Sequence, residues 1–136
     1  MPSPRCLLGT TIPLSAPNMS SPALVQINSM VVVFDGSAIF SGTVTRQTTY
    51  GFETTPIAGW ISVPRLGGSR ISTAMIHFSG FGNTQVSPGQ FVPHNVQYDG
   101  TLDLGLHSGW TGGAFSDLAP GYGGIPPTYT TATLAY

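Results

Sequence analysis

Residues 30–40, with the sequence MVVVFDGSAIF, decide what kind of fold this chain can form. Two runs of β-branched and aromatic residues, which favour β-strands, flank the pair Asp35-Gly36. Asp-Gly is typical of the type I′ turn of a β-hairpin, because both central positions of that turn need positive φ. The stretch therefore predicts an antiparallel hairpin, extended backwards by Leu24–Ile27 and forwards by Thr43–Thr45.

Short segments with high β propensity, separated by glycine and proline, continue beyond this hairpin. They are Thr48–Phe52, Ile57–Val63 and Arg70–Phe78. A second Asp-Gly pair, Asp99-Gly100, predicts another hairpin turn, between Phe91–Tyr98 and Thr101–Leu106. No segment keeps a helical period for long. We therefore predict an all-β domain, either an antiparallel sandwich or a jelly-roll-like barrel.

Two segments are expected to lie outside regular strands. Residues 1–23 hold five prolines, which block helices and central strands, but they also carry apolar side chains. They predict an extended N-terminal arm that docks on a neighbouring subunit, ahead of a single β domain over residues 24–136; a loose terminus is the alternative. Residues 107–127, rich in glycine and proline, predict a long loop. The arm residues expected to contact a partner are Leu7, Leu8, Ile12 and Leu14.

The sparse charge of the chain is its clearest indication of function. Charged residues make up 7% of the 136 residues, against about 25% in ordinary soluble domains. All four cations are arginine, and lysine is absent. Because protein interfaces deplete lysine and retain arginine, we expect neighbouring subunits to cover much of this surface; an acid-adapted secreted protein is the alternative. The net charge of −1 gives no attraction to nucleic acid or to an anionic membrane.

Motifs for catalysis and metal binding are missing from the sequence. His77, His94 and His107 lack the close spacing typical of zinc ligands. The nucleophile elbow G-x-S-x-G and the phosphate-binding loops do not occur. Glu53 and Asp103 could act as a glycosidase pair only if the fold brought them together. We therefore expect a protein that is not an enzyme and that binds no cofactor and no metal.

The best binding candidates are two tryptophans and two arginines. Trp60 and Trp110 have glycine neighbours, which expose a ring face for sugar stacking or for a protein hot spot. Burial in the core is the alternative for both and is favoured for Trp60. Arg65 and Arg70 flank a Gly-Gly turn and are expected to form a small clamp on a partner, unless both are simply solvated.

In composition the chain resembles small virion structural proteins, above all the head-decoration (cement) proteins of bacteriophages. The resemblance rests on the proline-rich arm 1–23, on the lysine-free strands 28–55 and on the loop 107–127. It implies a homo-oligomer, often a trimer, clamped onto a major capsid or other virion protein, with the virion assembled in the host cytoplasm. A carbohydrate-binding or adhesive module that uses Trp60 and Trp110 is the alternative, and a small glycosidase-type enzyme is the third interpretation.

Overall fold

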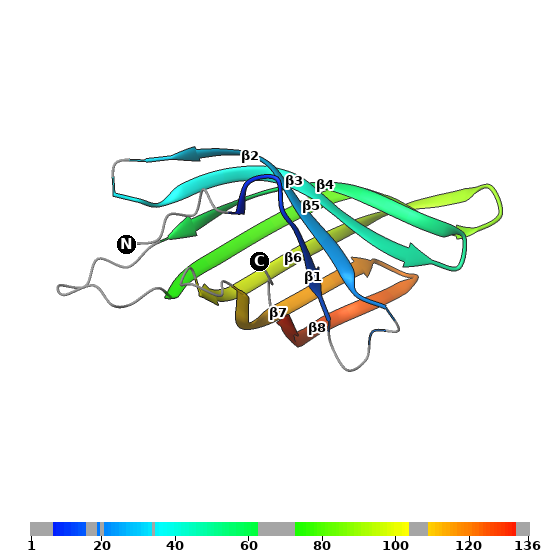
Figure 1. The fold of residues 1–136 in the computed structure, drawn as a ribbon. Helices are drawn as coiled ribbons and strands as arrows, with labels where there is room; N and C mark the ends of the chain where they lie inside the picture. Colours follow the sequence, from blue (N-terminus) through cyan, green and yellow to red (C-terminus); the bar gives the residue numbers. More distant parts are fainter. Residues whose placement is uncertain are drawn as a thin grey trace.

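The computed structural model describes residues 7–15, 19, 21–33, 35–62, 73–103 and 109–132, which form an antiparallel all-β fold. Eight strands make one sheet whose spatial order follows the order of the sequence (Figure 1). The predicted all-β, antiparallel class is therefore confirmed. The strands are β1 Thr11–Leu14, β2 Ala23–Val32, β3 Ala38–Thr48, β4 Gly51–Ser62, β5 Thr73–Ser87, β6 Gln90–Asp103, β7 Gly109–Ala119 and β8 Gly123–Ala132.

The sheet curls on itself into a half-barrel, and its edge strands β1 and β8 contact each other. The predicted sandwich or jelly roll is not confirmed, because each described strand pairs with the next strand in the chain. Most of the strands are 10–15 residues long, which lets one curved sheet cover both sides of its own interior. A single antiparallel meander thus encloses a hydrophobic core of the kind that a sandwich forms between two stacked sheets.

The inward-facing side chains of the curled sheet form the core. Along β4, Thr55, Ile57 and Ile61 are buried and Trp60 is exposed, as the two-residue period of a strand requires. The same alternation along β1–β7 brings aromatic and β-branched side chains together. The core members are Leu7, Ile12, Leu14, Ala23, Val25, Ile27, Phe40, Val44, Ile57, Ile61, Ala74, Ile76, Phe78, Val96, Tyr98 and Phe115.

Three glycines on the inward face let neighbouring strands approach closely. A Cβ added at Gly42 would lie 1.8 Å from the carbonyl oxygen of Gln26, and one at Gly59 would lie 1.9 Å from that of His77. At Gly80 the nearest carbonyl oxygen would be 2.2 Å away. Because no real Cβ tolerates such distances, these positions exclude every other residue, and the sheet can curl tightly there.

The hairpin predicted over residues 30–40 is confirmed, since β2 and β3 pair across it. Its turn is centred one residue earlier than the predicted type I′ turn, because the Gly36 amide donates to the Val33 carbonyl at 2.9 Å. The Val33 amide donates to Ser37, and Gly36 has a φ of +87°. This is a three-residue loop that closes on a left-handed glycine.

The hairpin predicted at Asp99-Gly100 is wrong. Both residues lie in the middle of β6, which pairs with β5 on one side and β7 on the other. A Cβ added at Gly100 would lie 2.7 Å from the hydroxyl of Tyr98, so close packing and not turn geometry requires glycine here. The turn between β5 and β6 is at Pro88-Gly89 instead, where Gly89 has a φ of +74°.

The N-terminal arm is not confirmed in the part of the chain that the structure describes. Within residues 1–23, the stretch Thr11–Leu14 is strand β1, paired antiparallel with β2. Leu7, Ile12 and Leu14 are at most 2% exposed and belong to the chain's own core. Proline is tolerated here because β1 is an edge strand. These residues are thus part of the same folded unit as β2–β8.

The long loop predicted over residues 107–127 is wrong for its described part. Residues 109–119 form β7, and residues 123–132 form β8. A short turn joins the two strands, with Gly121 at a φ of +85°. Of the prolines that suggested a loop, Pro120 lies in this turn, and Pro126 and Pro127 lie in β8. Because β8 is an edge strand, a missing amide donor costs little there.

Candidate functional site

The structure disperses the residues that the sequence predicted for partner binding. Of the four arm residues, only Leu8 is exposed, at 45%. Arg65 and Arg70 lie outside the described residues, so the arginine clamp stays a prediction. The backbone of Trp110 lies in β7, where it pairs with Leu102 and Ala132.

Trp60 lies on the outward face of β4, 41% exposed, so the core position favoured for it is wrong. Its indole ring stacks on the imidazole of His77 in β5, with ring centroids 5.8 Å apart and an interplanar angle of 24°. Gly59 does not act by uncovering this ring, since it faces inward against the backbone of β5. Trp60 is therefore available to a ligand or a partner on one side while His77 holds it on the other.

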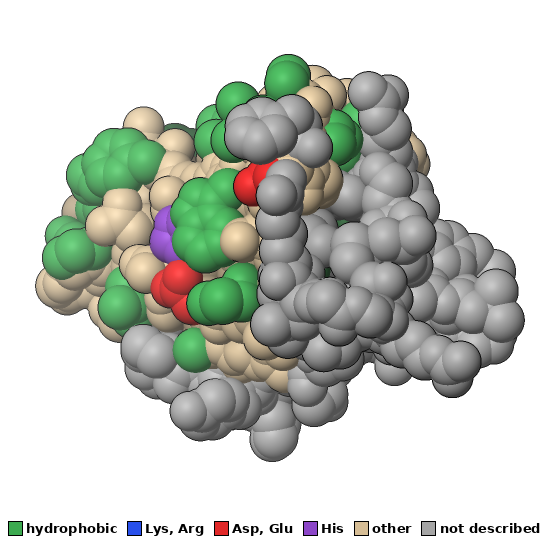
Figure 2. Space-filling model, turned by 90° about the vertical axis from the view of Figure 1, so that its left-hand side faces the viewer, with side chains coloured by type: hydrophobic (Ala, Val, Ile, Leu, Met, Phe, Trp, Pro, Cys, Tyr) green, Lys and Arg blue, Asp and Glu red, His purple; other side chains and the backbone are tan. Residues whose placement is uncertain are grey.

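A row of directly paired residues crosses the outward face from β2 to β6. Val31, Ile39, Trp60, His77 and Asp99 are successive cross-strand partners in this row, which we call the outer row. Val31 and Ile39 are 59% and 58% exposed. They line a shallow hollow of about 340 Å³. Figure 2 shows hydrophobic side chains gathered around a histidine, with acidic side chains beside them.

A hydrogen-bonded pair, His77 and Asp99, ends the outer row. Nδ1 of His77 lies 2.5 Å from Oδ1 of Asp99, and the amide of Gln97 donates to Oδ2 of Asp99 at 3.1 Å. Partial burial raises the pKa of Asp99, but the hydrogen bonds from His77 and Gln97, with the charge of His77, outweigh it and hold the pKa below the ordinary value of 3.8. The row thus joins an apolar half to a polar half that is hydrogen-bonded.

Replacing His77 by alanine is expected to raise the pKa of Asp99 back toward 3.8, because the largest interaction that lowers it is lost. The carboxyl ¹³C shift of Asp99, followed by NMR through an acid titration, measures this. Gln97→Ala is the control and should raise the pKa less. Since the folded pKa lies below the unfolded one, the pair stabilises the protein above the ordinary pKa, and this stabilisation disappears as the pH falls through the folded value. An unchanged pKa in His77→Ala would contradict the assignment.

A second cluster of polar side chains lies inside the curled sheet, at the end where β3 meets β4. Asp117 of β7, with 3% of its side chain exposed, accepts hydrogen bonds from Nε of Arg46 and from Nδ1 of His94, both at 2.7 Å. Nε2 of His94 lies 3.0 Å from the hydroxyl of Thr55 and 3.6 Å from Oε1 of Glu53. We call these five residues the inner network. It ties β3 and β4 to β6 and β7 across the interior.

The hydrogen bonds of the inner network define how its charges are held. Because Nδ1 of His94 donates to Asp117, Nε2 either accepts from Thr55 or, in the protonated ring, donates toward Thr55 and Glu53. Oε1 of Glu53 is buried without a hydrogen-bond partner among the described residues. Nε2 of His94 lies 3.6 Å from this oxygen, beyond hydrogen-bond distance. The main role of the inner network is therefore structural: its hydrogen bonds hold β3 and β4 to β6 and β7 across the curled sheet.

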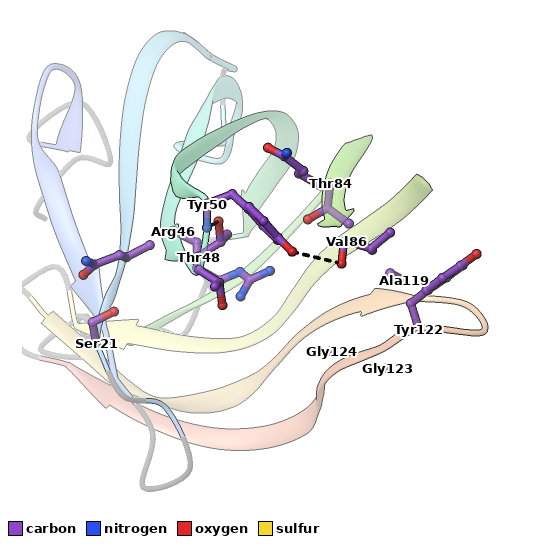
Figure 3. A pocket seen from close by; sticks show the side chains of 13 residues that line it. Ser21, Arg46, Thr48, Tyr50, Thr84, Val86, Ala119, Tyr122, Gly123 and Gly124 are labelled. Atoms are coloured by element: carbon purple, nitrogen blue, oxygen red, sulfur yellow. Dashed lines mark hydrogen bonds between the residues drawn. The ribbon is translucent and has the colours of Figure 1, made fainter. Parts of the chain in front are cut away.

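At the end of the curled sheet where β3 meets β4, there is also a polar cavity of about 750 Å³. Arg46 lines it beside hydroxyl and amide side chains, and the rings of Tyr50 and Tyr122 stand at it from two different turns (Figure 3). Arg46 is the one charged side chain of this lining among the described residues. The cavity is thus a polar site in direct contact with the inner network.

The described residues do not form the glycosidase pair or the metal site that the sequence left open. Glu53 lies near His94, whereas Asp103 pairs with Thr73 at the far end of β6, about 30 Å away along the strand; they form no glycosidase pair. Within the described ranges, histidine, cysteine and carboxylate side chains form no cluster of three that could hold a metal ion. The described part of the chain also has no helix that is long and apolar enough to cross a membrane.

Sequence reasoning missed the inner network because its members are far apart in the chain. Arg46 and Asp117 are separated by 71 positions, and no local motif links them. The available signal was strand parity: His94 lies two residues before the buried Val96, and Asp117 two residues after the buried Phe115. Polar residues at inward positions of a strand indicate a buried polar site.

Comparison with known proteins gives no further assignment, since no family model, no curated protein and no solved structure matches this chain.

Proposed function

We propose that this protein is a structural subunit of a larger assembly and that it docks on neighbouring subunits through the outer row and the apolar side chains around it. The observation that carries the proposal is the exposure of large apolar side chains on a folded sheet. In the outer row Val31 and Ile39 are 59% and 58% exposed. Met75, two residues from His77 on the same face of β5, is 57% exposed. Phe52 and Phe91 are also exposed, but they lie eight positions along β4 and β6 from the outer row and are not part of this surface. Exposed apolar patches mark interaction sites, and aromatic residues and methionine are enriched in interfaces.

Within this class we propose a decoration (cement) protein of a virus particle, most simply a homotrimer on the major capsid protein of a bacteriophage. The absence of lysine and the 7% of charged residues support it, because such a surface is suited to being covered. Cementing needs contact area and no reaction, cofactor, nucleic acid or membrane. Leu8 is the arm residue to which we assign a contact, since it is the exposed one among those described.

Ile39→Glu and Trp60→Glu are expected to weaken association at least about ten-fold, because each places an unpaired charge in the core of the interface. Native mass spectrometry and analytical ultracentrifugation measure the oligomer, and co-sedimentation measures binding to purified particles. Thr54→Glu is the matched control, since it adds the same charge at an exposed position of β4 outside the outer row. The proposal is contradicted if the wild-type protein stays monomeric at every accessible concentration and does not co-sediment with purified virus particles.

A carbohydrate-binding module is the second candidate, and the exposed ring of Trp60 favours it. A sugar could stack on the indole while Asp99 and Gln97 of β6, two strands away across β5, bind its hydroxyl groups. A glycan array with the isolated monomer separates the two functions: sugar binding that Trp60→Ala abolishes supports the module, and its absence leaves the docking proposal.

A further inference from the structure

We propose that the polar cavity binds a sugar acid, that is, a small molecule with several hydroxyl groups and one carboxylate. Its lining comes from the β3–β4 turn, the end of β5 and the β7–β8 turn (Figure 3). Its volume of about 750 Å³ lies in the usual range of small-molecule sites, about 300–1,000 Å³. The site is at the open end of the curl and does not involve the outer row.

Arg46 would bind the carboxylate. Its hydrogen bond to Asp117 uses Nε, so among the described residues the two Nη groups remain for a ligand. Asp117 is fixed in turn by His94 at 2.7 Å, which holds the guanidinium in one orientation. The side chain of Arg46 is 22% exposed. A guanidinium that is positioned in advance, with two donors on one edge, matches the geometry of a carboxylate.

Neutral polar groups would bind the hydroxyls of the sugar. Thr48 and Thr84 carry hydroxyls at the lining, and Gln47 and Gln85 carry amides. The Thr48 hydroxyl also donates to the Gly51 carbonyl and the Gln85 amide to the Ser87 carbonyl, so the rest of their hydrogen-bonding capacity is what a ligand would use. These groups both donate and accept hydrogen bonds, as sugar hydroxyls do. Asp117 lies behind Arg46 and is 3% exposed, so the positive group is the one that the ligand meets first.

Two tyrosine rings complete the site. Tyr50 is 44% exposed and Tyr122 is 55% exposed. The hydroxyl of Tyr50 donates to the Val86 carbonyl at 3.5 Å, and that of Tyr122 accepts from the Gln90 amide at 3.3 Å. An aromatic ring held at its rim presents a face to the C–H groups of a sugar ring.

The test is a titration of the full chain, followed by ¹⁵N NMR, with D-glucuronate, D-glucose and acetate in parallel. Saturable shifts are expected with glucuronate at Arg46, Gln85 and Tyr122. Glucose should bind at least about ten-fold more weakly, because it lacks the charge-assisted hydrogen bonds to Arg46. Acetate should bind more weakly than glucuronate, because it makes no contact with the tyrosine rings.

Variants place the site. Tyr122→Ala changes a residue exposed in a turn and leaves the inner network intact; it should weaken glucuronate binding about 3–10-fold. Trp60→Ala is the control on the opposite face and should not change it. The proposal is overturned if glucuronate gives no saturable shifts, if glucose or acetate binds as tightly, or if the shifts centre on Trp60. Each outcome is independent of association through the outer row.

Discussion

Replacement of Asp117 by alanine is expected to lower the free energy of unfolding by about 3–5 kcal/mol. The carboxylate accepts hydrogen bonds from both Arg46 and His94 at 2.7 Å, and its side chain is 3% exposed. Without it, the imidazole Nδ1–H of His94, whose side chain is 2% exposed, loses its partner in a place that water scarcely reaches, and the Arg46 guanidinium loses the carboxylate that neutralises it. A loss of this size is a large fraction of the stability of a typical domain, about 5–15 kcal/mol.

Urea unfolding followed by circular dichroism measures the effect, and Asp99→Ala is the matched control. Asp99 also binds a histidine, His77, but its side chain is 57% exposed, and exposed ion pairs contribute less than about 1 kcal/mol. Asp117→Asn should fall between the two, since the amide oxygen can still accept one of the hydrogen bonds. Equal losses for Asp117→Ala and Asp99→Ala would refute the assignment of a structural role to the inner network.

The two Asp-Gly pairs show what the sequence could predict about the fold. Asp35-Gly36 lies at a turn because the apolar runs on both sides pair with each other locally. Asp99-Gly100 has the same composition but lies inside β6, where a Cβ added at Gly100 would lie 2.4 Å from the Gly112 carbonyl oxygen of β7. That carbonyl lies beside position 100 only in the folded sheet, so local turn chemistry could not distinguish the two pairs.

The N-terminal segment shows the same limit. The prolines of residues 1–23 correctly exclude a helix and a central strand, yet the segment is an edge strand, which the same rule allows. Its leucines were assigned to a partner because nothing in the sequence shows that β8 lies beside β1. Deleting residues 1–22 would therefore remove Leu7, Ile12 and Leu14 from the core and unfold the protein, so such a deletion cannot test docking.

Strand parity would have placed both candidate sites. Ile57 and Ile61 share the inward face of β4, so Trp60 must point outward. The same two-residue alternation predicts that Glu53 and Thr55 point inward. The sequence could not show which strands face each other across the curl, and this is why the contact between Arg46 and Asp117 was unpredictable.

Gly59→Ala is expected to destabilise the protein by about 3 kcal/mol, at the upper end of what overpacking usually costs. The added Cβ would lie 1.9 Å from the carbonyl oxygen of His77 and 2.7 Å from Cα of Phe78. Both atoms belong to the backbone of β5, so the contact is relieved only by moving β4 and β5 apart. That movement would weaken the ladder between these strands and shift Trp60 relative to His77.

Gly82→Ala is the matched control for this substitution, because it is also an inward glycine of the sheet. Its added Cβ would meet its nearest atoms, in His94 and Thr55, at 3.5 Å, which is an ordinary contact. This variant should be within about 1 kcal/mol of the wild type, since alanine also lowers the entropy of the unfolded chain. Urea unfolding of the two variants compares their free energies of unfolding directly. Because Gly59, unlike Gly82, lies against the backbone of a neighbouring strand, Gly59→Ala should be clearly less stable than Gly82→Ala. Equal stability would mean that β4 and β5 do not approach as closely as the curl of the half-barrel requires.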